Sequence, residues 1–101
     1  MIRHIVLWTL KEEKDGQSKV EIALKMKERL KLLQDQISVI KNFEIGINDE
    51  EASDYNYDIC LNCCFTSIKD LHIYQTHPAH LEFIEYVKTI RIERIAIDYR
   101  I

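Results

Sequence analysis

The sequence predicts an α+β fold in which an antiparallel sheet of four strands carries helices on one face. Three observations lead to this prediction. Some segments alternate apolar and polar residues, others repeat apolar residues every three or four positions, and the two kinds follow one another in the order β-α-β-β-α-β. The chain has 101 residues with only 2 glycines and 1 proline, so we expect one domain, residues 1–101, with little loop.

Composition excludes several classes of protein. Hydrophobic residues make up 47% of the chain and charged residues 31%, the balance of a soluble globular protein. The net charge of -3 argues against a nucleic-acid partner and against an anionic membrane surface. The longest apolar run, residues 5–8, is far shorter than the roughly 20 residues that span a bilayer. Residues 1–4 lead directly into strand-like sequence, so we expect no signal peptide.

The chain has 3 cysteines, and two of them, Cys63 and Cys64, are adjacent. In a strand these two side chains point to opposite faces, and Cys60 and Cys63 are separated in the same way. A zinc or redox site needs such a spacing on a turn or a helix start. We therefore expect the three cysteines to act as small buried hydrophobic residues in a protein of a reducing, cytoplasmic compartment. We expect no metal site.

The first strand is predicted over residues 3–10, which contain no breaker and much β-favouring bulk. One face carries His4, Val6, Trp8 and Leu10, and the other carries Ile5, Leu7 and Thr9. Both faces are largely apolar, so we expect both to be buried.

A charged turn around Asp15-Gly16 is predicted for residues 11–17, and a helix follows it. Ser18 and Glu21 form a capping-box pattern at its start. The predicted buried face of this helix repeats every three or four residues: Ala23, Met26, Leu30, Leu33 and Ile37.

Two strands are predicted at residues 43–47 and 57–65, and the acidic loop 48–56 joins them as an antiparallel hairpin. Ser67 then caps a short helix that ends near Gln75. Pro78 breaks this helix and begins the next one, which runs to about residue 89 with His80, Ile84 and Val87 on one stripe. The last strand is predicted at residues 92–101.

This order is the split βαβ arrangement of ferredoxin-like folds. Its helices cover one face of the sheet, whereas the strands carry apolar residues on both faces. The chain has no further element to cover the second face. We therefore expect a homodimer through the open sheet face, in which two sheets form a dimeric α+β barrel.

The residues best suited to chemistry gather around the helix junction. His80 lies on the stripe that should face the sheet, and His4 on the first strand could meet the same interior. A neutral imidazole in an apolar pocket can act as a general base. Tyr74, one helical turn before the junction, could donate a hydrogen bond to a developing oxyanion. Equally, these histidines could only cap and pack.

The same pocket supplies candidate ligand-binding residues, namely Val6, Trp8, His77 and Ile84. His77 lies at the junction, where its ring could instead cap backbone N–H groups. His77 and His80 are three residues apart, but Pro78 interrupts the helix face between them, and no metal motif is present. Two isolated glycines cannot form a phosphate loop. We expect no cofactor, and a small apolar molecule as ligand.

Several motifs together resemble the stress-responsive A/B-barrel (Dabb) domain family. They are His4-Ile5-Val6-Leu7, Gly46, Phe65 before a Ser-initiated helix, Tyr74 followed by His77-Pro78-Ala79-His80, and the terminal Asp98-Tyr99. The resemblance spans the whole chain and implies a ferredoxin-like protomer in a dimeric barrel. Many members of the family have no known activity, and plant members include stress-linked proteins.

One branch, which includes the plant polyketide cyclase olivetolic acid cyclase, is catalytic. The resemblance to it implies a general base at His80 and an assisting tyrosine at Tyr74, with its other two histidines at His4 and His77. The sequence departs from this branch in the first long helix, where no tyrosine occurs between residues 18 and 37.

Three functions are therefore open. The first is binding of a small apolar or aromatic molecule between sheet and helices, with proton transfer by His80. The second is a non-enzymatic stress-associated or interaction protein. The third, weaker reading is a cofactor-independent monooxygenase or a haem-binding relative.

Overall fold

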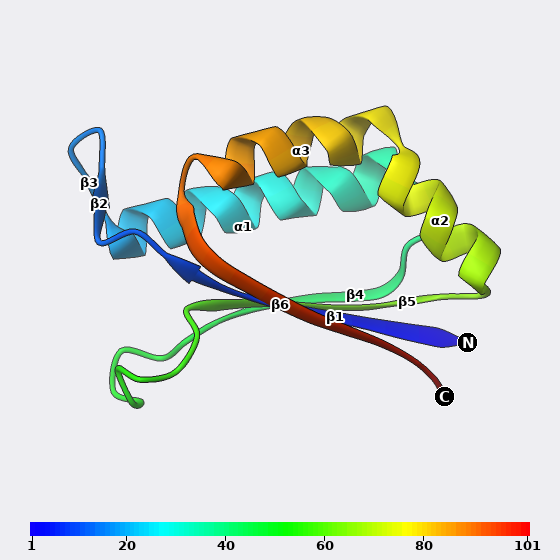
Figure 1. Cartoon of the computed structure of the whole chain (residues 1–101), viewed down its shortest axis with the longest axis horizontal. Helices are drawn as coiled ribbons and strands as arrows, with labels where there is room; N and C mark the ends of the chain where they lie inside the picture. The colour runs from blue at the N-terminus through cyan, green and yellow to red at the C-terminus, as the bar shows by residue number, and fades with distance from the viewer.

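The computed structural model describes residues 1–101 and arranges them in two layers (Figure 1). One layer is a four-stranded antiparallel sheet, and the helices cover one of its faces. The strands of this sheet are β1 (Ile2–Leu10), β4 (Lys41–Ile47), β5 (Ile59–Phe65) and β6 (Arg91–Arg100). The helices are α1 (Lys19–Gln36), α2 (Ile68–Thr76) and α3 (Pro78–Lys88). The predicted α+β, ferredoxin-like fold is confirmed.

The strand order is β4-β5-β1-β6, so the first and last strands of the chain lie side by side. The registers place His4 of β1 opposite Cys63 on one side and opposite Asp98 on the other. The helix-facing side of β1 is buried, as predicted. Its other side, formed by Ile5, Leu7 and Thr9, is only half-buried in this chain.

Helices α1 and α2 begin where the sequence predicts a cap. The backbone N–H of Glu21 donates to the Ser18 hydroxyl (3.3 Å), and the N–H of Ser18 donates to the Glu21 carboxylate (3.2 Å). Ser67 accepts the N–H of Asp70 (3.2 Å) at the start of α2. These bonds satisfy N–H groups that have no partner within a helix. None of the helices is both long and apolar enough to cross a membrane.

Strands β1, β4 and β6 begin one or two residues earlier than predicted, and two further differences have a local cause. Residues expected to form only a turn make a small hairpin, β2 (Glu13–Lys14) and β3 (Gln17–Ser18), because Asp15 and Gly16 both adopt positive φ (52° and 81°). The third long strand begins at Ile59 rather than at residue 57. Here the Asp58 carboxylate accepts the Leu10 N–H (2.7 Å) and so replaces a strand-to-strand backbone bond.

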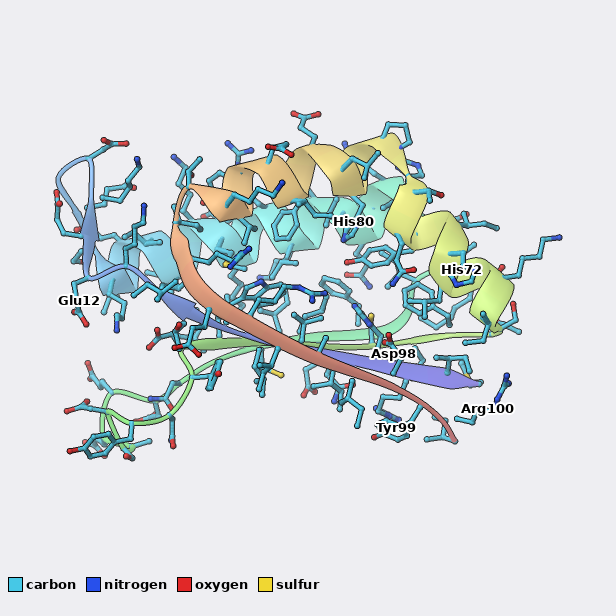
Figure 2. The ribbon with its side chains drawn as sticks, in the orientation of Figure 1. Glu12, His72, His80, Asp98, Tyr99 and Arg100 are labelled. Atoms are coloured by element: carbon cyan, nitrogen blue, oxygen red, sulfur yellow. The ribbon has the colours of Figure 1, made fainter.

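The core lies between the sheet and the helices. The predicted face of α1 is buried, as are Cys63 and Cys64, and all three cysteines are free thiols. Burial raises the pKa of the Cys63 thiol to about 12, which keeps it protonated and unreactive. The opposite sheet face has no helix over it (Figure 1), and the side chain of Tyr99 on β6 points away from the helices (Figure 2).

Candidate functional site

A cavity of about 250 Å³ lies between the helix-facing side of the sheet and helices α2 and α3. Strand β1 and helix α3 provide most of its lining, and its two ends differ in burial. The buried end is formed by His4 and Tyr74. The end at the surface is formed by Lys88, Arg91 and Arg94. The remaining lining residues are Val6, Trp8, His80, Phe83, Ile84 and Val87.

His4 occupies the buried end and is only 3% exposed. Its Nδ1 forms a hydrogen bond with the Asp98 carboxylate, which lies opposite on β6. Because a carboxylate only accepts, Nδ1 of His4 is the donor. The His4 ring meets the Tyr74 ring edge-on, with the centroids 5.8 Å apart. Asp98 thereby holds the imidazole against the tyrosine.

Tyr74 comes from α2 and is packed between His4 and His80. Its ring centroid lies 4.2 Å from that of His80. Burial raises the pKa of the Tyr74 phenol above its usual value, so the hydroxyl stays protonated at neutral pH. A protonated phenol that lines a cavity is a hydrogen-bond donor for an oxygen held there.

His80 lies in the first turn of α3, in the space between the helices and the sheet (Figure 2). Its Nδ1 lies 3.1 Å from the Gln75 carbonyl oxygen. A carbonyl only accepts, so Nδ1 carries the proton and Nε2 keeps its lone pair. Burial lowers the pKa of His80, and this effect outweighs the hydrogen bond to Gln75, which acts in the opposite direction. The ring is therefore neutral at pH 7 and can accept a proton.

These three side chains give the cavity a definite chemistry. It contains a neutral imidazole with a free lone pair beside a protonated phenol, and the remaining wall is apolar except for His4 and the three cationic residues at the surface end. A base and a hydrogen-bond donor in contact can remove a proton from a carbon acid and stabilise the resulting oxygen charge. No group of three or more His, Cys, Asp or Glu side chains in the chain could hold a metal ion.

Most of the site residues predicted from sequence lie around this one cavity: His4, Val6, Trp8, Tyr74, His80 and Ile84. His77 does not line it. The His77 Nδ1 accepts the backbone N–H of Ala79 (3.0 Å) and so caps α3. His72 is exposed on α2 and does not line the cavity; Figure 2 shows it on this helix.

Sequence reasoning missed three charged residues of the site, namely Lys88, Arg91 and Arg94. It also missed the hydrogen bond between Asp98 and His4. For Arg94 and Asp98, the spacing in the sequence could have shown that they lie on the same side of the sheet. Arg94 and Asp98 are four residues apart, so they share one face of the last strand. The register places them opposite Trp8 and His4, and only the pairing of β6 with β1 reveals this.

Comparison with known proteins agrees with this architecture. The family model of the Stress responsive A/B Barrel Domain matches residues 2–101. The chain belongs to this family. Members of the stress-responsive A/B barrel family share the fold derived above, and the predicted resemblance is confirmed. No curated protein matches the chain significantly.

Solved structures extend the comparison. A dimeric protein of unknown function from Bacteroides fragilis, with a ferredoxin-like fold, is 28% identical (TM-score 0.83; 99% of this chain and 95% of that chain). A dimeric ferredoxin-like protein from Thermobifida fusca is 23% identical (TM-score 0.80; 99% and 90%). The hydroxynitrile lyase from Passiflora edulis is 20% identical (TM-score 0.79; 99% and 92%). Two of these similar ferredoxin-like proteins are thus dimeric, and the fold also occurs in an enzyme.

Proposed function

We propose that this protein binds a small apolar or aromatic carbonyl compound in the cavity and transfers a proton with His80 as general base. The observation that carries the proposal is the free Nε2 of a neutral His80, in contact with the protonated Tyr74. The cavity volume of about 250 Å³ is just below the range of about 300–1,000 Å³ that holds drug-sized ligands. The ligand is accordingly a small molecule with one or two rings.

The residues of the site account for every proton and electron pair in the proposed step. Nε2 of His80 takes a proton from a carbon next to the carbonyl group, and the electrons of that C–H bond form the enolate. The hydroxyl of Tyr74 donates a hydrogen bond to the enolate oxygen. The proton then returns from His80 to carbon, so no cofactor takes part. His4, held by Asp98, fixes the position of the Tyr74 ring.

A purely structural role for His80 is the competing proposal. It would be favoured if backbone partners occupied both ring nitrogens or if no cavity lay beside the ring. Only Nδ1 has a backbone partner, and the ring lines the cavity. These two facts favour ligand binding over packing alone.

Binding is tested by filling the cavity. Ile84→Trp places a large side chain among the lining residues, whereas Leu81→Trp changes an exposed residue on the same helix. We expect aromatic ketones to raise the melting temperature of wild type and Leu81→Trp but not of Ile84→Trp. Equal stabilisation of both variants would contradict the binding proposal.

Proton transfer is tested separately by hydrogen–deuterium exchange of benzyl methyl ketone in D₂O, followed by NMR. Loss of a general base typically costs about 10²–10⁴ in rate. We expect His80→Gln to lose the catalysed exchange and Tyr74→Phe to retain binding with slower exchange. A wild-type exchange rate equal to that of His80→Gln would refute the catalytic part.

We further infer that two copies pair through the open sheet face. The apolar side chains Ile95, Ile97 and Tyr99 on β6 are 48%, 57% and 40% exposed. Contiguous exposed apolar residues on a sheet indicate an interface. The dimeric relatives from Bacteroides fragilis and Thermobifida fusca support this inference.

A further inference from the structure

The surface end of the cavity carries three cationic side chains. Lys88 is the last residue of α3, Arg91 is the first residue of β6, and Arg94 lies three residues further along this strand. The chain as a whole has a net charge of -3, so this end of the cavity is positive on an otherwise acidic protein. Charge of one sign at a cavity entrance attracts ligands of the opposite sign.

The two arginines have no acidic partner. Nζ of Lys88 lies 3.2 Å from the Glu85 carboxylate, which offsets its charge. The Arg91 guanidinium donates only to a backbone carbonyl, that of Ile92 (3.4 Å). Arg94 takes part in none of the ion pairs of the chain. Two guanidinium groups at the cavity are therefore free to bind an anion.

The carboxylate that shares a strand face with Arg94 is already paired with another side chain. Asp98 shares the helix-facing side of β6 with Arg94, but it is bound to His4 at the buried end of the cavity. Asp98 is four positions further along β6 than Arg94, which corresponds to about 13 Å along a strand. Arg94 also lies near enough to Tyr74 and His80 for its charge to act on both, in the direction that lowers the pKa of each, so the free positive charge adjoins the acid–base residues in one cavity.

We propose that Arg94 and Arg91 form an anion subsite for the carboxylate of a small aromatic acid whose ring lies in the cavity. The planar guanidinium group matches a carboxylate with two parallel hydrogen bonds, which a single ammonium group does not. Trp8 lies opposite Arg94 in the β1–β6 register and supplies apolar surface for the ring next to that carboxylate.

This inference rests on the proposed function, because it assumes that the cavity holds a small molecule, and it narrows the substrate class. A carboxylate bound at the surface end directs the opposite end of the ligand toward Tyr74 and His80. The substrate is then an aromatic acid that carries its carbonyl group away from the carboxylate.

Trp8, the only tryptophan of the chain, lines the cavity and reports binding by its fluorescence. The probes are naphthalene carboxylate and naphthalene carboxamide, which have nearly the same shape but differ in charge. We expect wild type to bind the carboxylate about tenfold more tightly than the amide, a difference of about 1.4 kcal/mol. Higher salt weakens binding of the carboxylate alone.

The matched variants are Arg94→Gln and Arg100→Gln. Both remove one positive charge from β6, but Arg100 lies outside the cavity lining, near the chain end (Figure 2). We expect Arg94→Gln to lose the preference for the carboxylate and to bind the amide unchanged. Arg100→Gln should behave as wild type.

The outcomes separate this inference from the proposed function. Equal affinity of wild type for carboxylate and amide overturns the anion subsite and leaves cavity binding intact. Binding of neither probe overturns both proposals. The same loss in Arg100→Gln as in Arg94→Gln means that overall charge, not a subsite, attracts the acid, and this also overturns the inference.

Discussion

At the scale of single residues, burial moves the pKa values of Tyr74 and His80 in opposite directions. Both shifts favour the neutral form, because a charged group in an apolar cavity loses its hydration. The phenol therefore keeps its proton, while the imidazole keeps a lone pair. One environment thus prepares a hydrogen-bond donor and a base in contact, as the proposed proton transfer requires.

The lowered pKa of His80 predicts a pH dependence of stability. Unfolded His80 protonates near its ordinary pKa of 6.5, whereas the folded ring resists protonation until lower pH. The unfolded state then binds more protons, so the free energy of unfolding decreases as pH falls below about 6.5. We expect the melting temperature to fall less between about pH 7 and pH 5 in His80→Asn than in wild type.

The control for this experiment is His72→Asn, which removes an exposed imidazole from α2. It should reproduce the pH dependence of wild type. If wild type and His80→Asn lose equal amounts of stability on acidification, the buried imidazole does not resist protonation as described.

At the scale of elements, the junction between α2 and α3 positions the site. His77 ends the first helix and caps the second, and Pro78 occupies the first turn of α3. The His77 ring accepts the backbone N–H of Ala79. His80 follows one residue later, and its Nδ1 forms a hydrogen bond with the Gln75 carbonyl. His77 does not line the cavity, but by capping α3 it helps to position His80, which does.

This role of His77 can be separated from ligand binding. Loss of an N-cap side chain costs about 0.5–2 kcal/mol of stability. We expect His77→Ala to lower the free energy of unfolding by that amount in a denaturant titration, and His77→Asn to restore most of it, since asparagine is a preferred cap. Ligand affinity per folded molecule should be the same in both. A loss of affinity in His77→Asn without loss of stability would instead assign His77 to the ligand.

At the scale of the whole molecule, the chain covers one face of its sheet and leaves the other open (Figure 1). Helices α1 and α3 pack on the first face. Apolar residues of β6 and half-buried residues of β1 remain on the second. A second copy would bury this face, and it would leave the cavity accessible because the cavity lies on the helix side.

A charge on the open face should break this pairing. We expect Ile97→Lys to shift the protein from dimer to monomer in light scattering, because burying an unpaired ammonium group opposes association. Leu81→Lys is the matched control, since Leu81 is similarly exposed (51% against 57%) but lies on α3. Dimers of Ile97→Lys as stable as those of wild type would place the interface elsewhere.

The site residues could be predicted from the sequence where a local pattern of apolar residues shows which face of a helix or strand points inward. The stripe through His80 and Ile84 and the alternation through His4 and Trp8 each identify an inward face without any structure. The role of Arg94 was not predictable in this way, because Trp8 lies 86 positions earlier in the sequence and the other cavity residues except Arg91 lie on other elements. Its place beside Trp8 depends on the β1–β6 register, which no local pattern specifies.

The sequence by itself determined the order of elements, the caps of α1 and α2, the buried faces and the family, because each depends on neighbouring residues or on a motif. Tertiary structure decided the rest: the pairing of Asp98 with His4, the proton position on His80, and the two free arginines at the cavity. These features arise where distant segments meet, since burial and hydrogen-bond partners exist only after the chain has folded.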